Sequence, residues 1–207
     1  MTKAQEISDH WGKGDVYSRI LETMELAGID PNTLTIEQLA PVDHFHARGF
    51  PATVELADAL PIREGDTLVD IGCGIGGPAR YLAKRFNCRV EGIDITAPFI
   101  EAANKLSALV AMQDAVRCQH GDGQNLPYKD ETFDGGYSQH VLMNVPDRTT
   151  FFAEAFRVLK PGAFFALTEH GLGPVGEPPH PVPWSEDGCG AYLMRPSDTV
   201  DILKETG

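Results

Sequence analysis

The stretch LVDIGCGIGGPAR, residues 68–80, decides the fold of this chain. LVDI at its start predicts a strand, and GPARYLAKRF from residue 77 onward predicts a helix. The turn between strand and helix is built from Gly72, Gly74, Gly76 and Gly77. Glycine adopts backbone dihedrals that other residues avoid, and it lets a ligand press against the main chain. The amides exposed at the start of the helix favour a negatively charged ligand group.

Strands and helices alternate along the chain from Glu64 onward. The expected strands cover residues 67–72, 89–95, 116–122, 133–140 and 162–170. The expected helices cover residues 77–86, 98–113, 149–160 and 198–207. This alternation indicates βαβ crossovers, and therefore a doubly wound, mostly parallel α/β sheet with helices on both faces.

Two segments lie outside this alternation. Residues 1–60 carry apolar residues at three- and four-residue spacing, which predicts a helical N-terminal cap. Within it, Thr35 with Gln38 three residues later is typical of a capping box. Residues 171–196 are rich in Gly and Pro without a period, as in a lid-like loop. We expect residues 61–207 to form the α/β domain, and the whole chain to be one structural domain.

The charge of the chain limits its partners. Asp and Glu total 30 against 17 Lys and Arg, and the formal net charge of −13 would repel nucleic-acid backbones and anionic membranes. No apolar run approaches the length of a membrane span, and the start MTKAQEISDHWGKGD lacks a secretory apolar region. The four cysteines show no metal-ligand spacing, so we expect no metal site and a reducing, cytoplasmic compartment.

Acidic residues are expected where three successive strands end. Asp94 ends the second strand, 24 residues beyond Asp70 of the first, where a carboxylate can accept hydrogen bonds from a ribose diol. Asp122 ends the third strand and is placed to accept from an exocyclic amine such as adenine N6. Because open α/β sheets bind ligands at this edge, the three carboxylates are predicted to line one crevice. In the alternative interpretation, Asp94 and Asp122 cap the helices that follow them.

The glycines of the turn satisfy two overlapping patterns. Gly72-x-Gly74-x-x-Gly77 fits the dinucleotide fingerprint, whereas Asp70-x-Gly72-x-Gly74-x-Gly76 fits the pattern of methyltransferases. A dinucleotide enzyme normally has a second nucleotide-binding half and a substrate domain, for which 207 residues leave little room. The length therefore favours the methyltransferase pattern, and an NAD(P)-dependent oxidoreductase stays as the alternative because the glycines fit both patterns.

Motifs along nearly the whole chain resemble those of the class I S-adenosylmethionine (SAM) dependent methyltransferases. VDIGCGIGG (69–77) is similar to their first motif, GIDI (92–95) to the second, and GDGQNLPYKDETFDGGYSQH (121–140) to the third and fourth. FRVLKPGAFFALTEH (156–170) resembles the segment around their fifth strand. VDHFHARGFPATVELADAL (42–60) resembles the helical segment that closes over the methionine end of SAM in sarcosine and phosphobase enzymes. The chain is also similar to tocopherol-type and quinone-biosynthesis methyltransferases.

The resemblance implies SAM as cofactor and S-adenosyl-L-homocysteine (SAH) as product. Gly72 and Gly74 would let the backbone approach SAM, and Asp70 would orient that loop. Asp94 would hold the ribose hydroxyls, and Ile95 would pack on the adenine.

The resemblance also assigns residues to the two ends of the cofactor. At the adenine, Asp122 would accept from N6 and Gly123 would donate its backbone N–H. Gln139 and His140 would border the sulfonium, and His46 would lie near the methionine carboxylate.

His140 is the candidate for contact with the methyl acceptor and for catalysis. In the sarcosine and phosphobase enzymes an acidic residue is followed, four positions on, by an assisting histidine. Here SQHVLMNVPD places His140 and Asn144 at those positions, which leaves the acceptor open. The resemblance implies methyl transfer to an N, O or C nucleophile of a small molecule, with an amine favoured. A SAM-binding pseudoenzyme or partner subunit is the non-enzymatic alternative.

Other aromatic side chains have two interpretations. Trp11, Tyr17 and Trp184 can cover an acceptor site, but aromatic residues in such places usually pack. His170 and His180 lie in or beside the Pro-rich segment and are expected to be solvated.

The resemblance also implies two further strands. The family fold has seven strands, of which the last two form a hairpin after the helix expected at 198–207. This chain supplies five, so the C-terminal hairpin is expected to be missing and strand 162–170 to be an exposed edge. We expect either a truncated chain or another molecule, such as a second copy, covering that edge.

Overall fold

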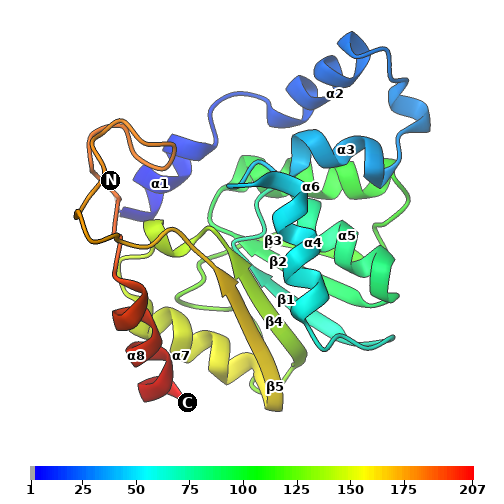
Figure 1. The fold of residues 1–207 in the computed structure, drawn as a ribbon. Coiled ribbons are helices and arrows are strands. Elements are labelled where there is room, and N and C mark those ends of the chain that lie inside the picture. Colours follow the sequence, from blue (N-terminus) through cyan, green and yellow to red (C-terminus); the bar gives the residue numbers. More distant parts are fainter. Residues whose placement is uncertain (1–2) are drawn as a thin grey trace.

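A sheet of five parallel strands lies at the centre of the molecule, with helices on both faces (Figure 1). The computed structural model describes residues 3–207. The strands are β1 (Thr67–Ile71), β2 (Arg89–Asp94), β3 (Val116–His120), β4 (Phe133–Gln139) and β5 (Leu159–Thr168). They lie in the order β3-β2-β1-β4-β5, and each neighbouring pair is parallel. The predicted doubly wound α/β sheet is confirmed.

Helices precede the sheet, connect its strands and follow it. They are α1 (Lys3–Trp11), α2 (Val16–Leu26), α3 (Ile36–Asp43), α4 (Gly49–Ala59), α5 (Gly77–Phe86), α6 (Ala97–Leu109), α7 (Arg148–Val158) and α8 (Pro196–Thr206), with 3-10 helices η1 (Pro31–Thr33) and η2 (Leu142–Asn144). Thr35 and Gln38 form the expected capping box at the start of α3. The first two residues of the predicted N-terminal cap lie outside the described residues, and the division into cap and α/β domain stays a prediction.

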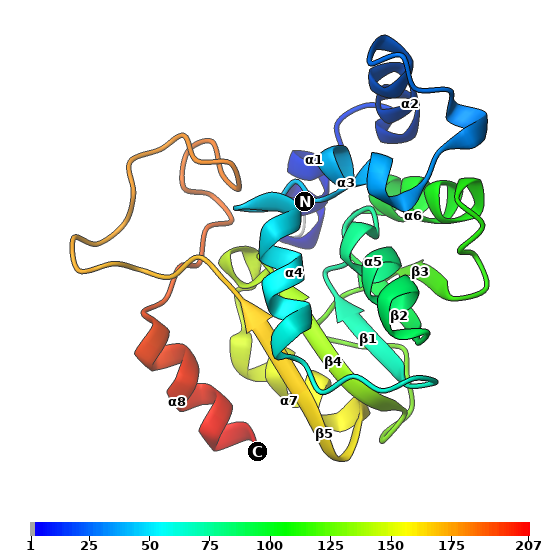
Figure 2. The same cartoon turned by 45° about the vertical axis from the view of Figure 1, so that its right-hand side comes forward.

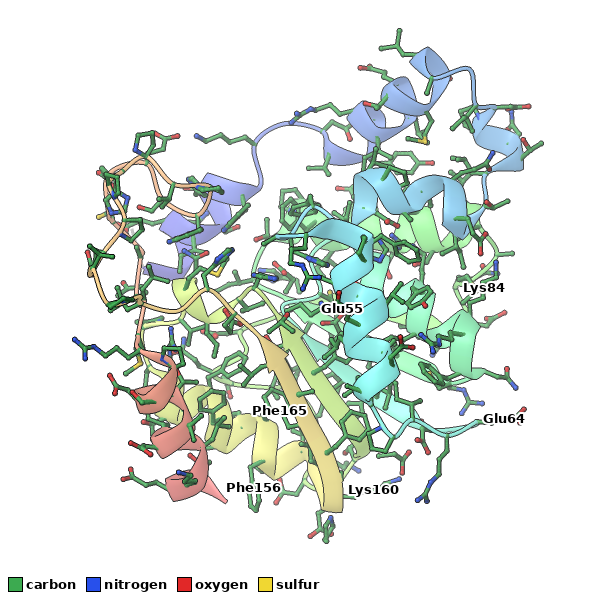
Figure 3. All side chains as sticks on the ribbon, in the orientation of Figure 1. Glu55, Glu64, Lys84, Phe156, Lys160 and Phe165 are labelled. Atoms are coloured by element: carbon green, nitrogen blue, oxygen red, sulfur yellow. The ribbon has the colours of Figure 1, made fainter. Side chains whose placement is uncertain are left out.

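Alternate residues of β1 build the two halves of the core. Leu68 packs with apolar side chains of α4, α5 and α6 on one face of the sheet. Val69 and Ile71 point the other way and pack with α7. On that second face, the ring of Phe165 in β5 lies 6.4 Å from a phenylalanine ring of α7 (Figure 3). The sheet is therefore buried on both faces, as parallel sheets require.

Several boundaries differ from the sequence-based expectation, and three of them have a structural consequence. β3 ends at His120, because Asp122 already forms a tight turn, so this carboxylate lies two residues beyond the strand. β5 begins at Leu159, three residues earlier than expected. α8 begins at Pro196, a residue whose fixed φ suits the first turn of a helix, so the preceding loop ends at Arg195.

The loop of residues 171–195 lies beside α1, although the two segments are near opposite ends of the sequence (Figure 1). His10 Nε2 lies 2.9 Å from the carbonyl oxygen of Pro183, and Lys13 Nζ lies 3.0 Å from a carboxylate oxygen of Glu186. Exposed contacts of this kind add little stability. They show, however, that the two segments meet above the carboxyl edge of the sheet.

β5 forms one edge of the sheet, and α8 lies outside it (Figure 2). Within residues 3–207, β5 pairs with β4 alone, while α8 packs on α7. Coverage of this edge by further chain or by a second copy stays a prediction. No helix in the described part of the chain is long and apolar enough to cross a membrane.

Candidate functional site

A cavity of about 810 Å³ lies at the carboxyl edge of the sheet, where β1, β2 and β4 end. Every residue predicted to bind the cofactor or react lines it: His46, Asp70, Gly72, Gly74, Asp94, Ile95, Asp122, Gly123, Gln139 and His140. Sequence reasoning therefore brought together residues that do meet in space. The ligand that each one contacts stays a prediction.

The turn after β1 requires glycine at residue 72. Gly72 has a φ of 86°, and a Cβ there would lie 2.1 Å from Cγ2 of Val141. Its amide donates to the carbonyl oxygen of Ile93 over 2.7 Å, which ties the turn to the end of β2. At Gly74 a Cβ would meet, among the described residues, only the ring of Phe45 at 3.7 Å. The backbone at Gly74 is therefore open to the cavity.

Asp94 connects the turn to the start of α6. Its Oδ2 accepts from the amide of Gly74 over 2.9 Å, and its Oδ1 accepts from the amide of Thr96 over 2.8 Å. Thr96, not Asp94, is the N-cap residue, so the capping interpretation of Asp94 is wrong. Burial raises the pKa of Asp94, and the two amide donors act against that rise. Each oxygen keeps a further lone pair with which it can accept a ligand hydroxyl.

Asp70 is buried inside β1, two residues before Gly72. Its carboxylate accepts from the hydroxyl of Tyr137 over 2.9 Å, and Tyr137 is its register partner in β4. Burial raises the pKa of Asp70 to about 7, the Tyr137 hydrogen bond lowers it, and the charge of Asp94 raises it. Asp94 is thus the carboxylate that bonds to the glycine turn, while the expected orientation of that loop by Asp70, directly or through water, stays a prediction.

Asp122 and Gly123 form the turn that follows β3. Asp122 Oδ1 accepts from the amide of Gln124 over 2.8 Å, so this carboxylate stabilises its own turn and caps no helix. A Cβ at Gly123 would lie 2.7 Å from a ring carbon of Phe151. The absence of a side chain at Gly123 keeps its backbone at the cavity wall.

His46 is held in one orientation beside β4. Its Nδ1 lies 3.2 Å from the carbonyl oxygen of Ala47, and its Nε2 lies 3.1 Å from the hydroxyl oxygen of Thr53, which itself donates to Oε1 of Gln139. Burial lowers the pKa of His46. Next to Thr53, Gln139 Nε2 is buried without a hydrogen-bond partner in the described residues. Gln139 therefore keeps a donor for a ligand.

His140 lies at the centre of a row of rings. It stacks on His46 with centroids 5.3 Å apart, and its centroid lies 4.7 Å from that of His170. Its Nδ1 is buried and has no hydrogen-bond partner among the described residues. Burial lowers the pKa of His140 to about 4, with smaller contributions from His170 and His46. The imidazole is therefore neutral at pH 7 and free to bind a ligand.

The row continues through His170 and then Trp184, for which cover of the acceptor site was one of two interpretations. The expectation that His170 is solvated is wrong: it is half-buried, lines the cavity and stacks on Trp184 at 4.7 Å. His170 follows the carboxyl end of β5, so the rule that identified Asp94 would have found it. His180 is half-buried outside the cavity. Tyr17, in α2, packs against core residues and is not among the residues that line the cavity.

Asn144 forms hydrogen bonds to both segments that cover the cavity, α1 and the 171–195 loop. Its Oδ1 accepts from the indole N–H of Trp11 in α1 over 3.2 Å. Its Nδ2 donates to the carbonyl oxygens of Gly190, over 2.8 Å, and Trp184, over 3.2 Å, in the 171–195 loop. Asn144 thus holds the covers at the position where the similar enzymes carry an assisting histidine. No group of three or more His, Cys, Asp or Glu in residues 3–207 is arranged to hold a metal ion.

Comparison with known proteins agrees with this geometry. The family model described as "Methyltransferase domain" matches residues 69–167. The 27-O-demethylrifamycin SV methyltransferase of Amycolatopsis mediterranei (strain S699) is 39% identical over 122 residues, which are 59% of this chain and 45% of that protein. The chain thus spans about half the length of this curated relative.

Solved structures of a geranyl diphosphate methyltransferase share the fold. The complex with its substrate and sinefungin covers 99% of this chain and 80% of that chain, with a TM-score of 0.75 and 23% identity. The complex with SAM covers 75% of this chain and 63% of that chain, with a TM-score of 0.67 and 26% identity. The resemblance deduced from the motifs is confirmed. Residues 69–167 thus match a methyltransferase domain, and through them the chain is similar to the class I SAM-dependent methyltransferases.

Proposed function

We propose that this protein transfers the methyl group of SAM to an N, O or C nucleophile of a small molecule. The observation that carries the proposal is the single cavity in which a glycine turn, Asp94 and Asp122 face a row of neutral imidazoles. The glycine turn with Asp94 and Asp122 suits an adenosyl ligand, and the imidazoles suit a methyl acceptor. The match of the methyltransferase family model also argues against the oxidoreductase alternative.

The residues of the cavity suit SAM on several counts. Asp94 has acceptor capacity for the ribose hydroxyls, and Asp122 has it for the adenine amine. Gly74 presents open backbone next to the N-terminus of α5. The unpartnered Nε2 of Gln139 supplies a donor, and His46 lies beside it through Thr53.

SAM brings an activated methyl group on a positive sulfonium, so the protein chiefly aligns the reactants and excludes water. In our proposal, α1 and the 171–195 loop exclude water, and His140 contacts the acceptor. With SAM bound, the cavity would align a neutral amine or hydroxyl group with the methyl carbon, and the transfer would leave SAH, a neutral thioether. The proton of the nucleophile passes to the free imidazole nitrogen of His140 and then to water. An amine acceptor stays the favoured prediction.

Calorimetry and turnover test this proposal together. We expect SAH to bind the full chain and NADH not to bind, and we expect SAH to form from SAM with at least one member of a panel of small amines, phenols and alcohols. NADH binding without any response to SAH would instead support an oxidoreductase. SAH binding without turnover across the panel would support a pseudoenzyme or partner subunit.

A further inference from the structure

The structure points to the chemical class of the acceptor, an inference that rests on the proposed function. We propose that the acceptor is an apolar, ring-containing molecule without phosphate or carboxylate, held between α1 and the 171–195 loop. Its nucleophilic N–H or O–H group would face His140. The argument uses the charge of the cavity wall, its apolar surfaces and its unpartnered polar atoms.

The cavity wall offers no positive side chain to an anionic acceptor. Within residues 3–207, every Asp, Glu, Lys or Arg that lines the cavity is an aspartate: Asp43, Asp70, Asp94 and Asp122. The nearby Arg80 is fully buried behind the wall, where it pairs with Asp43 at 2.9 Å. A phosphate group on the acceptor would therefore find no positive side chain as a partner in the cavity wall, and the wall's negative charges do not favour an anion. The amides at the start of α5 lie on the side of the cavity assigned to SAM.

The acceptor half of the cavity is covered by apolar and aromatic surface. Ile7 and Trp11 come from α1, Met143 from η2, and Pro183 and Trp184 from the loop. The indole N–H of Trp11 is already used by Asn144, so the ring face is what remains for a ligand. Surfaces of this kind stack on flat rings and bind them through buried apolar area.

Two unpartnered polar atoms show where the polar group of the acceptor would lie. His140 Nδ1 and Trp184 Nε1 are both buried, and neither has a hydrogen-bond partner in the described part of the chain. His170 lies between the two rings, 4.7 Å from each. These groups are uncharged, so they complement a hydroxyl or amine group and supply no counter-charge for an anion.

Calorimetry with matched probes tests the inference on the full chain saturated with SAH. The probes are 2-naphthol, 2-naphthylamine and 2-naphthyl phosphate, each with and without Mg²⁺. We expect the two uncharged probes to bind at least about tenfold more tightly than the phosphate ester. Equal or tighter binding of the ester would overturn the inference, and so would failure of both uncharged probes to bind. A chain that does not bind SAH would contradict the proposed function itself, so the two failures are distinguishable.

Variants locate the probe within the cavity. Trp184→Ala is expected to weaken 2-naphthol binding about tenfold, Trp184→Phe to weaken it less, and neither to change SAH affinity. Phe156→Ala is the control, because Phe156 is exposed on α7 (Figure 3). Ile7→Lys adds a positive charge to the wall and is expected to favour the phosphate ester, with Ile7→Met as its uncharged control. Unchanged 2-naphthol affinity in Trp184→Ala would contradict the proposed position of the acceptor.

Discussion

The backbone amide of Gly74 donates to Oδ2 of Asp94 over 2.9 Å, so the carboxylate that ends β2 holds the glycine turn that follows β1. One side chain thereby shapes the turn and faces the cavity. Loss of this carboxylate should remove a ligand contact and release the turn together.

Substitution of Asp94 tests this double role. We expect Asp94→Ala to lower SAH affinity by about 10- to 100-fold, because hydrogen bonds to a charged group are lost. Asp94→Asn should lose less, since its amide oxygen can still accept from Gly74. Calorimetry measures both affinities, and Asp58→Ala, on the surface of α4, is the control. Wild-type affinity in Asp94→Ala would contradict the assignment.

Asp70 should make the stability of the ligand-free protein depend on pH. Its pKa is raised to about 7 by burial, whereas an unfolded aspartate ionises near its ordinary value of 3.8. Between these values the folded state binds more protons than the unfolded state, so the free energy of unfolding falls as pH rises from about 4 to about 7.

Asp70→Asn should remove the contribution of Asp70 to that pH dependence, while Glu169, whose pKa burial also raises to about 7, keeps its own. We expect the variant to be more stable than the wild type at pH 8, by about 2 to 4 kcal/mol, and to differ little from it at pH 4. Urea unfolding at the two pH values measures the change. Tyr137→Phe removes a hydrogen bond that lowers the Asp70 pKa, so its stability should go on falling above pH 7. Parallel pH profiles of wild type and Asp70→Asn would rule the explanation out.

His140→Asn tests the proposed proton acceptor with little change to the backbone. His140 has a φ of 55°, a conformation that asparagine tolerates better than most residues. We expect kcat to fall by about 100-fold or more while SAH affinity is retained. Because the pKa of His140 is lowered to about 4, wild-type turnover should show no loss from this group between pH 5 and 8.

Steady-state kinetics across this pH range are compared with those of Gln113→Asn, a substitution of an exposed residue outside the cavity. Retained kcat in His140→Asn would argue against a role for His140 in proton transfer.

Asn144→Ala should loosen both covers of the cavity. It removes one acceptor from Trp11 and two donated hydrogen bonds to the 171–195 loop. We expect faster hydrogen exchange in both segments and a KM for the acceptor raised by about tenfold. Asn125→Ala, an exposed position, is the matched control. Increased exchange confined to one segment would show that Asn144 does not join them.

The sheet and the contents of the cavity were predictable because their signals are local. Short apolar runs separated by helical patterns define the strands, and parallel strands bring their carboxyl ends to one edge. Asp94 and His140 could therefore be placed together although neither is near the other in sequence. Exclusion of nucleic-acid and membrane partners, and the cytoplasmic location, rest on charge and composition and stay predictions.

The missed features depend on contacts that no local pattern encodes. Asn144 meets Trp11 across 133 positions of sequence, and its other two partners lie in a loop that has no hydrophobic period. The pairing of Asp70 with Tyr137 follows from the register of β1 with β4, which appears only when the strands are aligned. His170 was interpreted from the Pro-rich residues after it, whereas the strand before it determines its position.

Because Asn144 bonds to both α1 and the loop, movement of either segment alone would leave a polar atom of Asn144 without a hydrogen-bond partner. We therefore expect α1 and the 171–195 loop to open together when a small molecule enters or leaves the cavity. Release of the demethylated cofactor product and binding of the next acceptor would then be limited by the same rate of opening.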